Sequence, residues 1–144
     1  MTTRSRIIRW LVVLLWIMII LAVSSIPNLP DKLPASWSKG IIPSIPDDLK
    51  GYEIVAAFTH FGEFLILAFV LSWAVVGRSE AKIVKLLVFS LSILYAFYDE
   101  IYQDGIPGRG FQVSDLTFDT LGVLAGMYLY QMIHSRHKKK EEGL

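Results

Sequence analysis

The sequence predicts an all-α, multi-pass membrane protein with four transmembrane helices, forming one domain over residues 1–144. Hydrophobic residues make up 53% of the chain. They gather in four runs, and a helix needs roughly 20 apolar residues to cross a bilayer core of about 30 Å. Backbone polar groups in lipid must be satisfied within each segment, so four runs imply a four-helix bundle. The runs cover residues 7–26, 54–76, 83–102 and 116–134.

The first run follows three basic residues, Arg4, Arg6 and Arg9. We expect a transmembrane helix, but the pattern has an alternative. A basic start, an apolar core and the small residues Ala22-Val23-Ser24 are also typical of a cleaved signal peptide. The length of the apolar run favours the helix.

The first connection, residues 27–52, contains five prolines, which rule out a long helix there. Its apolar residues predict a cap lying at the membrane interface, and the alternative is a plain loop. The second connection, near residues 77–80, is short and predicts a helical hairpin. The third, residues 104–114, is glycine-rich and must turn sharply while it holds Arg109 between two helix ends. Residues 135–144 form a basic tail near anionic lipid.

The positions of lysine and arginine predict the orientation. Ten of the fourteen lie at the N-terminus, in the second connection and in the tail, and four lie on the opposite side. Both termini are therefore expected in the cytoplasm, and the proline-rich first connection is expected outside. Most of the acidic residues then face outward, which places the chemistry on the extracytoplasmic side.

Polar residues in three of the helices are predicted to share one layer. At about 1.5 Å per residue, Glu63 and Asp99 each lie about 21 Å from the inner end of their helices. Asp119 lies about 25 Å up the fourth helix, and His60 lies one turn above Glu63. An unpaired charge in hydrocarbon costs several kcal/mol, so a chain that retains such residues is expected to use them. Bracing of the helices by salt bridges is the alternative.

The spacing of polar residues along each helix predicts which of them share a face and point into the bundle. Asp115, Asp119, Gly122 and Gly126 fall on one stripe, and the two glycines form a G-x-x-x-G pair that predicts close helix packing. Asp99 and Gln103 also share a face, whereas Glu100 is rotated by about 100° and is expected to lie off the site and pair with a neighbour. Asp115 could instead be only an N-cap or first-turn acid, with Ser114 as a second cap candidate.

These residues predict an outward-facing site for a phosphorylated head group. Acid–base chemistry is assigned to four side chains, His60, Glu63, Asp99 and Asp115. Arg109 is expected to hold phosphate in bidentate fashion. The predicted substrate-binding set is Arg109, Gln103, Gln112, Asp119 and Glu100. Oxygen ligands with one histidine suit Mg²⁺, Mn²⁺ or Zn²⁺, but the spacing matches no dedicated metal motif, so the cofactor is left open.

Four short segments carry a recognisable order of residues. They are His-Phe-Gly-Glu-Phe at 60–64, a D-E-x-x-Q pattern at 99–103, Pro-Gly-Arg at 107–109 and a D-x-x-x-D-x-x-G pattern at 115–122. This order of motifs resembles that of the VanZ-like family of small membrane proteins, and the resemblance extends over all four predicted helices. The chain departs from many members at Ala57, where they have lysine, and at Asp119, where they have asparagine. These departures predict a more acidic site and leave the ligand charge open.

The resemblance implies a cell-envelope role in a bacterial plasma membrane, because the family is named after a protein associated with resistance to glycopeptide antibiotics such as teicoplanin. It implies no settled reaction. Three functions therefore stay open: hydrolysis or transfer of a phosphorylated head group, binding of a lipid or a lipoglycopeptide without catalysis, and proton-coupled transport. The expected partners are the bilayer and a membrane lipid or lipid-linked envelope precursor, without nucleic acid, and homo-oligomerisation is left open.

Overall fold

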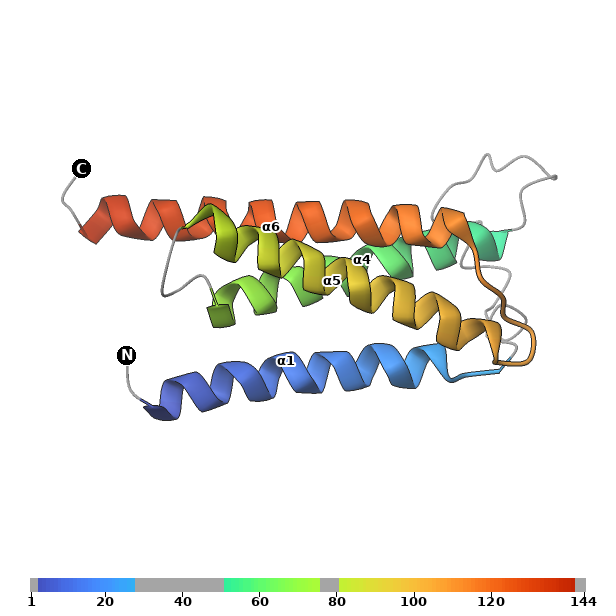
Figure 1. Ribbon diagram of the computed structural model, residues 1–144. Coiled ribbons are helices and arrows are strands. Elements are labelled where there is room, and N and C mark those ends of the chain that lie inside the picture. The colour runs from blue at the N-terminus through green and yellow to red at the C-terminus, as the bar shows by residue number, and fades with distance from the viewer. Residues whose placement is uncertain (1–2, 28–50, 76–80, 142–144) are drawn as a thin grey trace.

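The protein is described by a computed structural model over residues 3–27, 51–75 and 81–141. This part of the chain is all-α, and its helices are α1 (Thr3–Ser24), α4 (Gly51–Val75), α5 (Lys82–Asp104) and α6 (Val113–Glu141). The prediction of an all-α chain with one helix for each apolar run is confirmed there. The four helices lie roughly along one axis, with α1 and α5 running towards the α5–α6 connection and α4 and α6 running away from it (Figure 1). We call the end with the α5–α6 connection the loop end, and the end with the start of α1 the terminal end.

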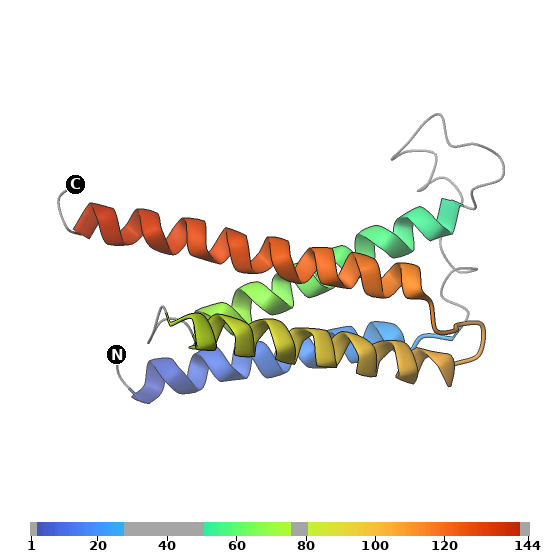
Figure 2. The same ribbon diagram turned by 45° about the horizontal axis from the view of Figure 1, so that its top comes forward.

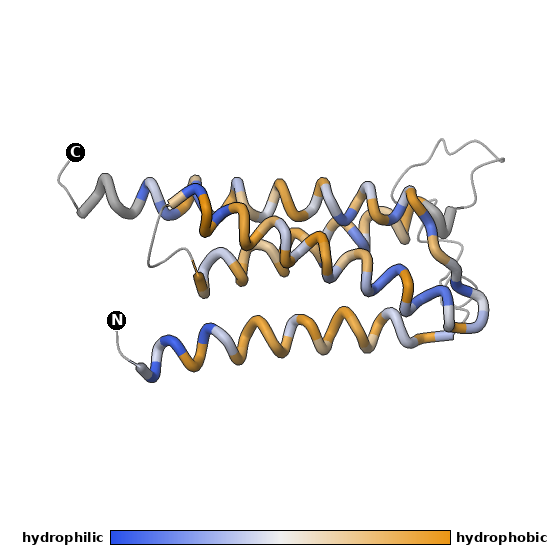
Figure 3. Tube along the Cα trace, in the orientation of Figure 1, coloured by the Kyte–Doolittle hydropathy of each residue, from blue (hydrophilic) through white to orange (hydrophobic). Residues whose placement is uncertain are grey.

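The exterior of the bundle is apolar. Large hydrophobic side chains such as Leu15, Leu94 and Tyr128 are 62–70% exposed. Figure 3 shows hydrophobic residues along the middle of the helices and hydrophilic ones towards the two ends. Two helices, Thr3–Ser24 and Ile54–Val75, are long and apolar enough to cross a membrane. Contact with lipid would remove the cost of exposing this apolar surface to water, so the exterior suits a membrane protein.

The closest packing is between α4 and α6, which cross near the middle of the bundle (Figure 2). A Cβ atom added to Gly122 would overlap the backbone carbonyl of Phe61, and one added to Gly126 would overlap that of Leu65. Both glycines therefore let the α6 backbone lie directly against α4. The predicted role of the G-x-x-x-G pair is confirmed, and it turns the stripe with Asp115 and Asp119 towards the interior.

An apolar layer lies directly below the polar one. Its buried members include Ile20, Phe64, Ala96 and Val123, one from each helix. Each is four residues, or about one turn, from a buried polar residue on the same helix. Those polar residues are Ser24, His60, Glu100 and Asp119. The layer separates the polar residues at the loop end from a second apolar cluster towards the terminal end, around Val13, Leu71 and Val88.

The helix bounds differ from the apolar runs by one to four residues at each end, except at the C-terminal end of α6, where the difference is larger. Helix α6 begins at Val113 and continues to Glu141, so the first part of the basic tail at 135–144 is helical. Lysine, arginine and glutamate are good helix formers, and basic residues near a helix C-terminus interact favourably with its dipole. The predicted interfacial cap in the first connection and most of the second connection, at 77–80, lie outside the described residues.

Candidate functional site

Six polar or ionisable residues are buried at the loop end, and none is more than 7% exposed. They come from α4, α5 and α6: His60, Asp99, Glu100, Gln103, Asp115 and Asp119. Ser24, which is 1% exposed, adds a contribution from α1. All four helices therefore supply the polar layer, whereas the sequence predicted three.

His60 stands at the centre of one group of carboxylates. Its Nδ1 atom lies 3.0 Å from Asp119 Oδ1 and 3.9 Å from Glu100 Oε1. Its other ring nitrogen, Nε2, lies 3.6 Å from Asp115 Oδ2. The imidazole ring thus faces three acids from two helices, and we call these four residues the histidine cluster.

Asp99 belongs to a second group, formed by hydrogen bonds that run from α1 to the connection between α5 and α6. Ser24 Oγ donates to Asp99 Oδ1 over 2.6 Å, and Gln103 Nε2 donates to Asp99 Oδ2 over 2.7 Å. The Nη1 group of Arg109 in turn donates to Gln103 Oε1. We call this the Asp99 relay. It connects the arginine of the connection to a buried carboxylate, and both oxygens of that carboxylate accept a hydrogen bond.

A tight turn places Arg109. Gly108 has a φ of 75°, in the left-handed region that glycine adopts without strain, and the Arg109 N–H donates to the Ile106 carbonyl over 3.0 Å. The Arg109 side chain is half-buried, and its Nε atom has no hydrogen-bond partner within the described residues. Burial lowers the pKa of Arg109, and the charges of four acids oppose that decrease. Those acids are Asp99, Glu63, Glu100 and Asp115.

The start of α6 holds Glu100 in place. The backbone N–H of Gln112 donates to Glu100 Oε2 over 2.9 Å, while the Gln112 side chain is exposed. Because α6 begins at Val113 and the Gln112 carbonyl accepts the N–H groups of Asp115 and Leu116, the cap position is Gln112, and the alternative in which Ser114 or Asp115 is the N-cap is wrong. Asp115 lies in the first turn of α6, which agrees with the alternative that it is a first-turn acid. It also faces His60.

Glu63 lies at the margin of the layer. Its side chain is half-buried, whereas the six residues of the layer are buried. Its backbone carbonyl accepts one from the Trp16 indole over 2.8 Å, which joins α1 to α4. Glu63 is close enough to Arg109 for their charges to attract.

The expectation that Glu100 lies off the site is wrong. Asp99 and Glu100 are both fully buried, with Asp99 hydrogen-bonded to α1 and Glu100 facing His60 of α4. Helix α5 is covered by neighbours on more than one side, so a rotation of about 100° leads to another buried face. Ser24 was not among the residues predicted for the site. The signal was present, because a small polar residue ends the first apolar run, but the same residues also fit a cleavage site.

The arrangement offers three kinds of chemistry. The histidine cluster contains groups that can exchange protons, and three of its members place ligand atoms within 4.8 Å of one another, as a metal site requires. Those members are His60, Glu100 and Asp119. Arg109 supplies a cation with a free donor beside them. The fold therefore places a cation, acids and a histidine together at one end of the bundle.

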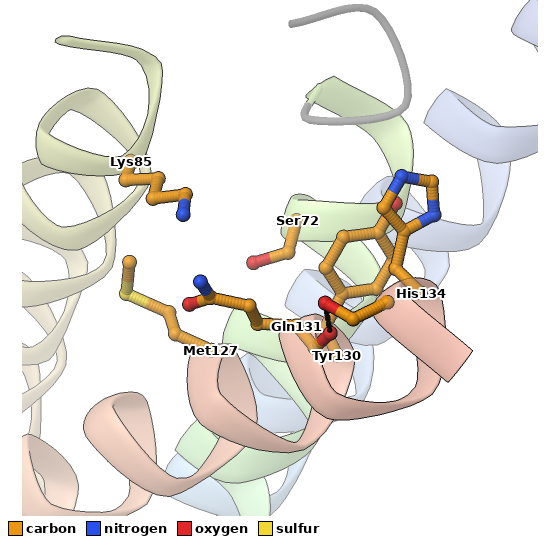
Figure 4. A pocket seen from close by; sticks show the side chains of 7 residues that line it. Ser72, Lys85, Met127, Tyr130, Gln131 and His134 are labelled. Carbon is orange, nitrogen blue, oxygen red and sulfur yellow. Dashed lines mark hydrogen bonds between the residues drawn. The ribbon is translucent and has the colours of Figure 1, made fainter. Parts of the chain in front are cut away.

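A separate pocket lies towards the terminal end (Figure 4). It opens between α4, α5 and α6 and shares no residue with the polar layer. Its lining includes Ser72, Lys85, Met127, Tyr130, Gln131 and His134. The sequence analysis assigned no role to these residues, and the acids of the polar layer are absent from its lining.

Comparison with known proteins identifies the family. The pattern that defines the VanZ/LLP1 family matches residues 8–134, which include most of α1 and α6, all of α4 and α5, and every residue of the polar layer. No curated protein and no solved structure matches the chain. Together with the two membrane-length helices, the match indicates a membrane protein. The match covers most of the chain, and the protein therefore belongs to the VanZ/LLP1 family.

Proposed function

We propose that this protein crosses the plasma membrane four times, with both termini in the cytoplasm, and binds a phosphorylated lipid or envelope-precursor head group on the extracytoplasmic side. In this proposal the protein also hydrolyses or transfers that head group. The distribution of basic residues supports the orientation, because ten of fourteen fall on the side with the termini. The apolar exterior of α5 and α6 supports the two further spans.

The observation that supports the proposal most directly is the surroundings of Arg109, which is half-buried and has a donor group without a partner in the described part of the chain. That donor is the buried Nε group, and the guanidinium lies near four acids, two of which belong to the histidine cluster. An arginine offers five N–H donors in a fixed fork, which matches the oxygens of a phosphate. The acids around Arg109 favour its charged form, and its Nε group, which has no hydrogen-bond partner within the described part of the chain, could donate to an anion.

The histidine cluster would supply the chemistry. In the proposed reaction, acids of the histidine cluster, Asp115 among them, exchange protons with the substrate and water, and Arg109 stabilises the charge on the phosphoryl oxygens. The apolar layer around Phe64 and Val123 closes the site from below, so water and a head group would enter from the loop end. This direction agrees with the proposed extracytoplasmic site.

Phosphate release from a panel of lipid phosphates tests the reaction. We expect turnover by the wild-type protein in detergent or vesicles, and a loss of about 100-fold or more for Asp115→Asn, since general acid–base groups contribute at least that much. Arg109→Ala is expected to lose activity as well. Asp104→Asn is the matched control, because it removes an exposed carboxylate at the same end of α5. Turnover that survives in both Asp115→Asn and Arg109→Ala would overturn the catalytic proposal.

Binding without catalysis is the second candidate, and the Asp99 relay favours it. Both oxygens of Asp99 already accept hydrogen bonds from Ser24 and Gln103, as in a structural carboxylate. In that case the protein would mask a lipid or the lipophilic tail of a glycopeptide antibiotic. Masking of this kind would suit a family that is named after a protein associated with resistance to such antibiotics. No turnover, with stoichiometric lipid retained through purification, would support binding. No turnover and no retained lipid would exclude both functions.

Proton-coupled transport has less support. A relay across the membrane needs ionisable groups at several depths. In α4, the residues between Glu63 and Val75 include no ionisable side chain. The buried acids instead gather on one side of the apolar layer.

A further inference from the structure

The histidine cluster has the geometry of a metal site, and we propose that His60, Glu100 and Asp119 bind one divalent cation of the Mn²⁺ or Zn²⁺ type. These three residues, which we call the trio, come from α4, α5 and α6, so the ion would join three helices. The inference rests on the geometry, burial and charge of these side chains. It holds whether or not the ligand of Arg109 is a lipid phosphate.

The distances between the ligand atoms suit a single bound ion. The ligand atoms of His60, Glu100 and Asp119 lie within 4.8 Å of one another. From His60 Nδ1 the distances are 3.0 Å to Asp119 Oδ1 and 3.9 Å to Glu100 Oε1. Two ligand atoms that are each about 2 Å from a tetrahedral Zn²⁺ are about 3.3 Å apart. The observed distances lie on either side of this value, so small rotations of the side chains would complete the site.

The second argument is the presence of unpartnered oxygens. Glu100 and Asp119 are fully buried. Within the described residues, Glu100 Oε1 and Asp119 Oδ2 have no hydrogen-bond partner. A buried carboxylate oxygen without a partner loses the hydrogen bonds that it would make to water, which is costly. Glu100 Oε1 is also the oxygen that faces the His60 ring. A cation bound there would satisfy it.

The net charge of the three residues also favours a bound cation. With a protonated His60, the two carboxylates of Glu100 and Asp119 leave the trio with a net charge of −1. With a neutral His60 and a divalent cation, the trio and its ion are neutral. Neutrality matters more in the interior of a membrane bundle than at a surface, because a buried net charge is poorly solvated. Asp115 lies nearby and increases the demand for positive charge.

The groups around the trio resemble the outer shell of known metal sites. Metal-binding histidines usually present their second nitrogen to a carboxylate, and metal-binding carboxylates are themselves hydrogen-bonded. Here Nε2 of His60 faces Asp115 Oδ2 at 3.6 Å, and Glu100 Oε2 accepts the Gln112 N–H. Asp115 would thus orient the ring, and the start of α6 would hold Glu100 with its other oxygen free.

The donor set selects the class of ion. One imidazole nitrogen with carboxylate oxygens suits Mn²⁺ or Zn²⁺, whereas Mg²⁺ and Ca²⁺ prefer oxygen ligands alone. The chain contains no cysteine, so thiolate ligands are excluded. Three protein ligands leave a coordination position open, which is the arrangement of catalytic rather than purely structural zinc sites.

Titration of the purified, chelator-treated protein with ZnCl₂ or MnCl₂ tests the proposal. We expect one saturable ion per chain, measured by calorimetry for Zn²⁺ and by electron paramagnetic resonance for Mn²⁺. Glu100→Gln, Asp119→Asn and His60→Gln should each weaken binding more than tenfold. Asp115→Asn should weaken it about 10–100-fold, as loss of an outer-shell group does.

Two variants serve as matched controls. Asp104→Asn removes an exposed carboxylate at the loop end, and His134→Ala removes a histidine at the terminal end. Both should bind the ion as the wild type does. No saturable binding by the wild type would overturn the proposal, and so would binding that survives the three trio substitutions or that is lost in His134→Ala.

A measurement on the wild type alone covers the case in which trio variants fail to fold. Electron spin-echo modulation of bound Mn²⁺ detects nitrogen in the coordination shell. We expect one imidazole nitrogen, from His60. A bound ion without nitrogen coordination would contradict the assignment of His60 as a ligand and overturn the site.

Discussion

Asp99 and Glu100 are adjacent in the sequence but contact different neighbours. Asp99 accepts hydrogen bonds from Ser24 and Gln103, and Glu100 faces His60 and the start of α6. The depth of both residues could be predicted from the helical rise, because rise per residue is nearly constant. Their partners could not, because the face that each neighbouring helix covers depends on how the helices pack. Ser24 could be seen as a small polar residue at the end of the first apolar run, but its contact with Asp99 depends on how α1 packs against α5.

Ser24→Ala tests the Asp99 relay. The substitution removes a 2.6 Å hydrogen bond to a fully buried carboxylate. Loss of such a bond should lower the free energy of unfolding by about 1–3 kcal/mol. Ser135→Ala is the control, because Ser135 is exposed, and it should change this free energy by less than about 0.5 kcal/mol. Equilibrium unfolding in mixed micelles measures both. Equal effects from the two substitutions would show that the Ser24 contact contributes nothing specific.

The pair of helices α4 and α6 shows what sequence spacing can predict at the scale of elements. The stripe of Asp115, Asp119, Gly122 and Gly126 predicted both the packing face and the inward direction of the acids, and the structure has both. The start of α6 was less predictable. An apolar run marks the part of a helix in lipid, whereas the helix itself begins where capping and turn geometry allow, here at Val113.

Gly122→Ala tests the packing of α4 against α6. The added methyl group would overlap the Phe61 carbonyl, which is backbone and cannot rotate away. We expect a loss of about 1–3 kcal/mol in the free energy of unfolding, as in other overpacked sites.

The control for this packing test is Gly62→Ala on α4. Nothing lies within 4 Å of the Cβ position at Gly62. Alanine there should be neutral or should stabilise the helix by about 0.5–1 kcal/mol, since it has the higher helix propensity. The same unfolding assay applies. Destabilisation by Gly62→Ala equal to that by Gly122→Ala would refute a specific contact at Gly122.

At the scale of the whole molecule, the protein has an apolar exterior and a polar layer inside one end. Composition and the four apolar runs could predict the fold class, because lipid imposes long helices. They could not identify the ligand, since the same cation, acids and histidine suit binding and catalysis alike. The proposed extracytoplasmic position of the site follows from the basic residues alone and can be tested directly.

The absence of native cysteines makes an orientation test simple. Single cysteines at the exposed positions Phe111 and Ser135 would report the loop end and the terminal end. A membrane-impermeant maleimide applied to intact cells should label Phe111→Cys, and should label Ser135→Cys only after the membrane is permeabilised. The reverse pattern would place the site in the cytoplasm.

The central claim is that Arg109 holds a phosphate-bearing lipid at the loop end. Phosphorus and lipid bound per purified chain, measured by mass spectrometry, test it most directly. We expect about one phospholipid or lipid-linked phosphate per chain for the wild type and at least tenfold less for Arg109→Ala. Arg136→Ala, which removes an exposed arginine at the terminal end, should retain the wild-type amount. Equal retention by Arg109→Ala and the wild type would contradict the account.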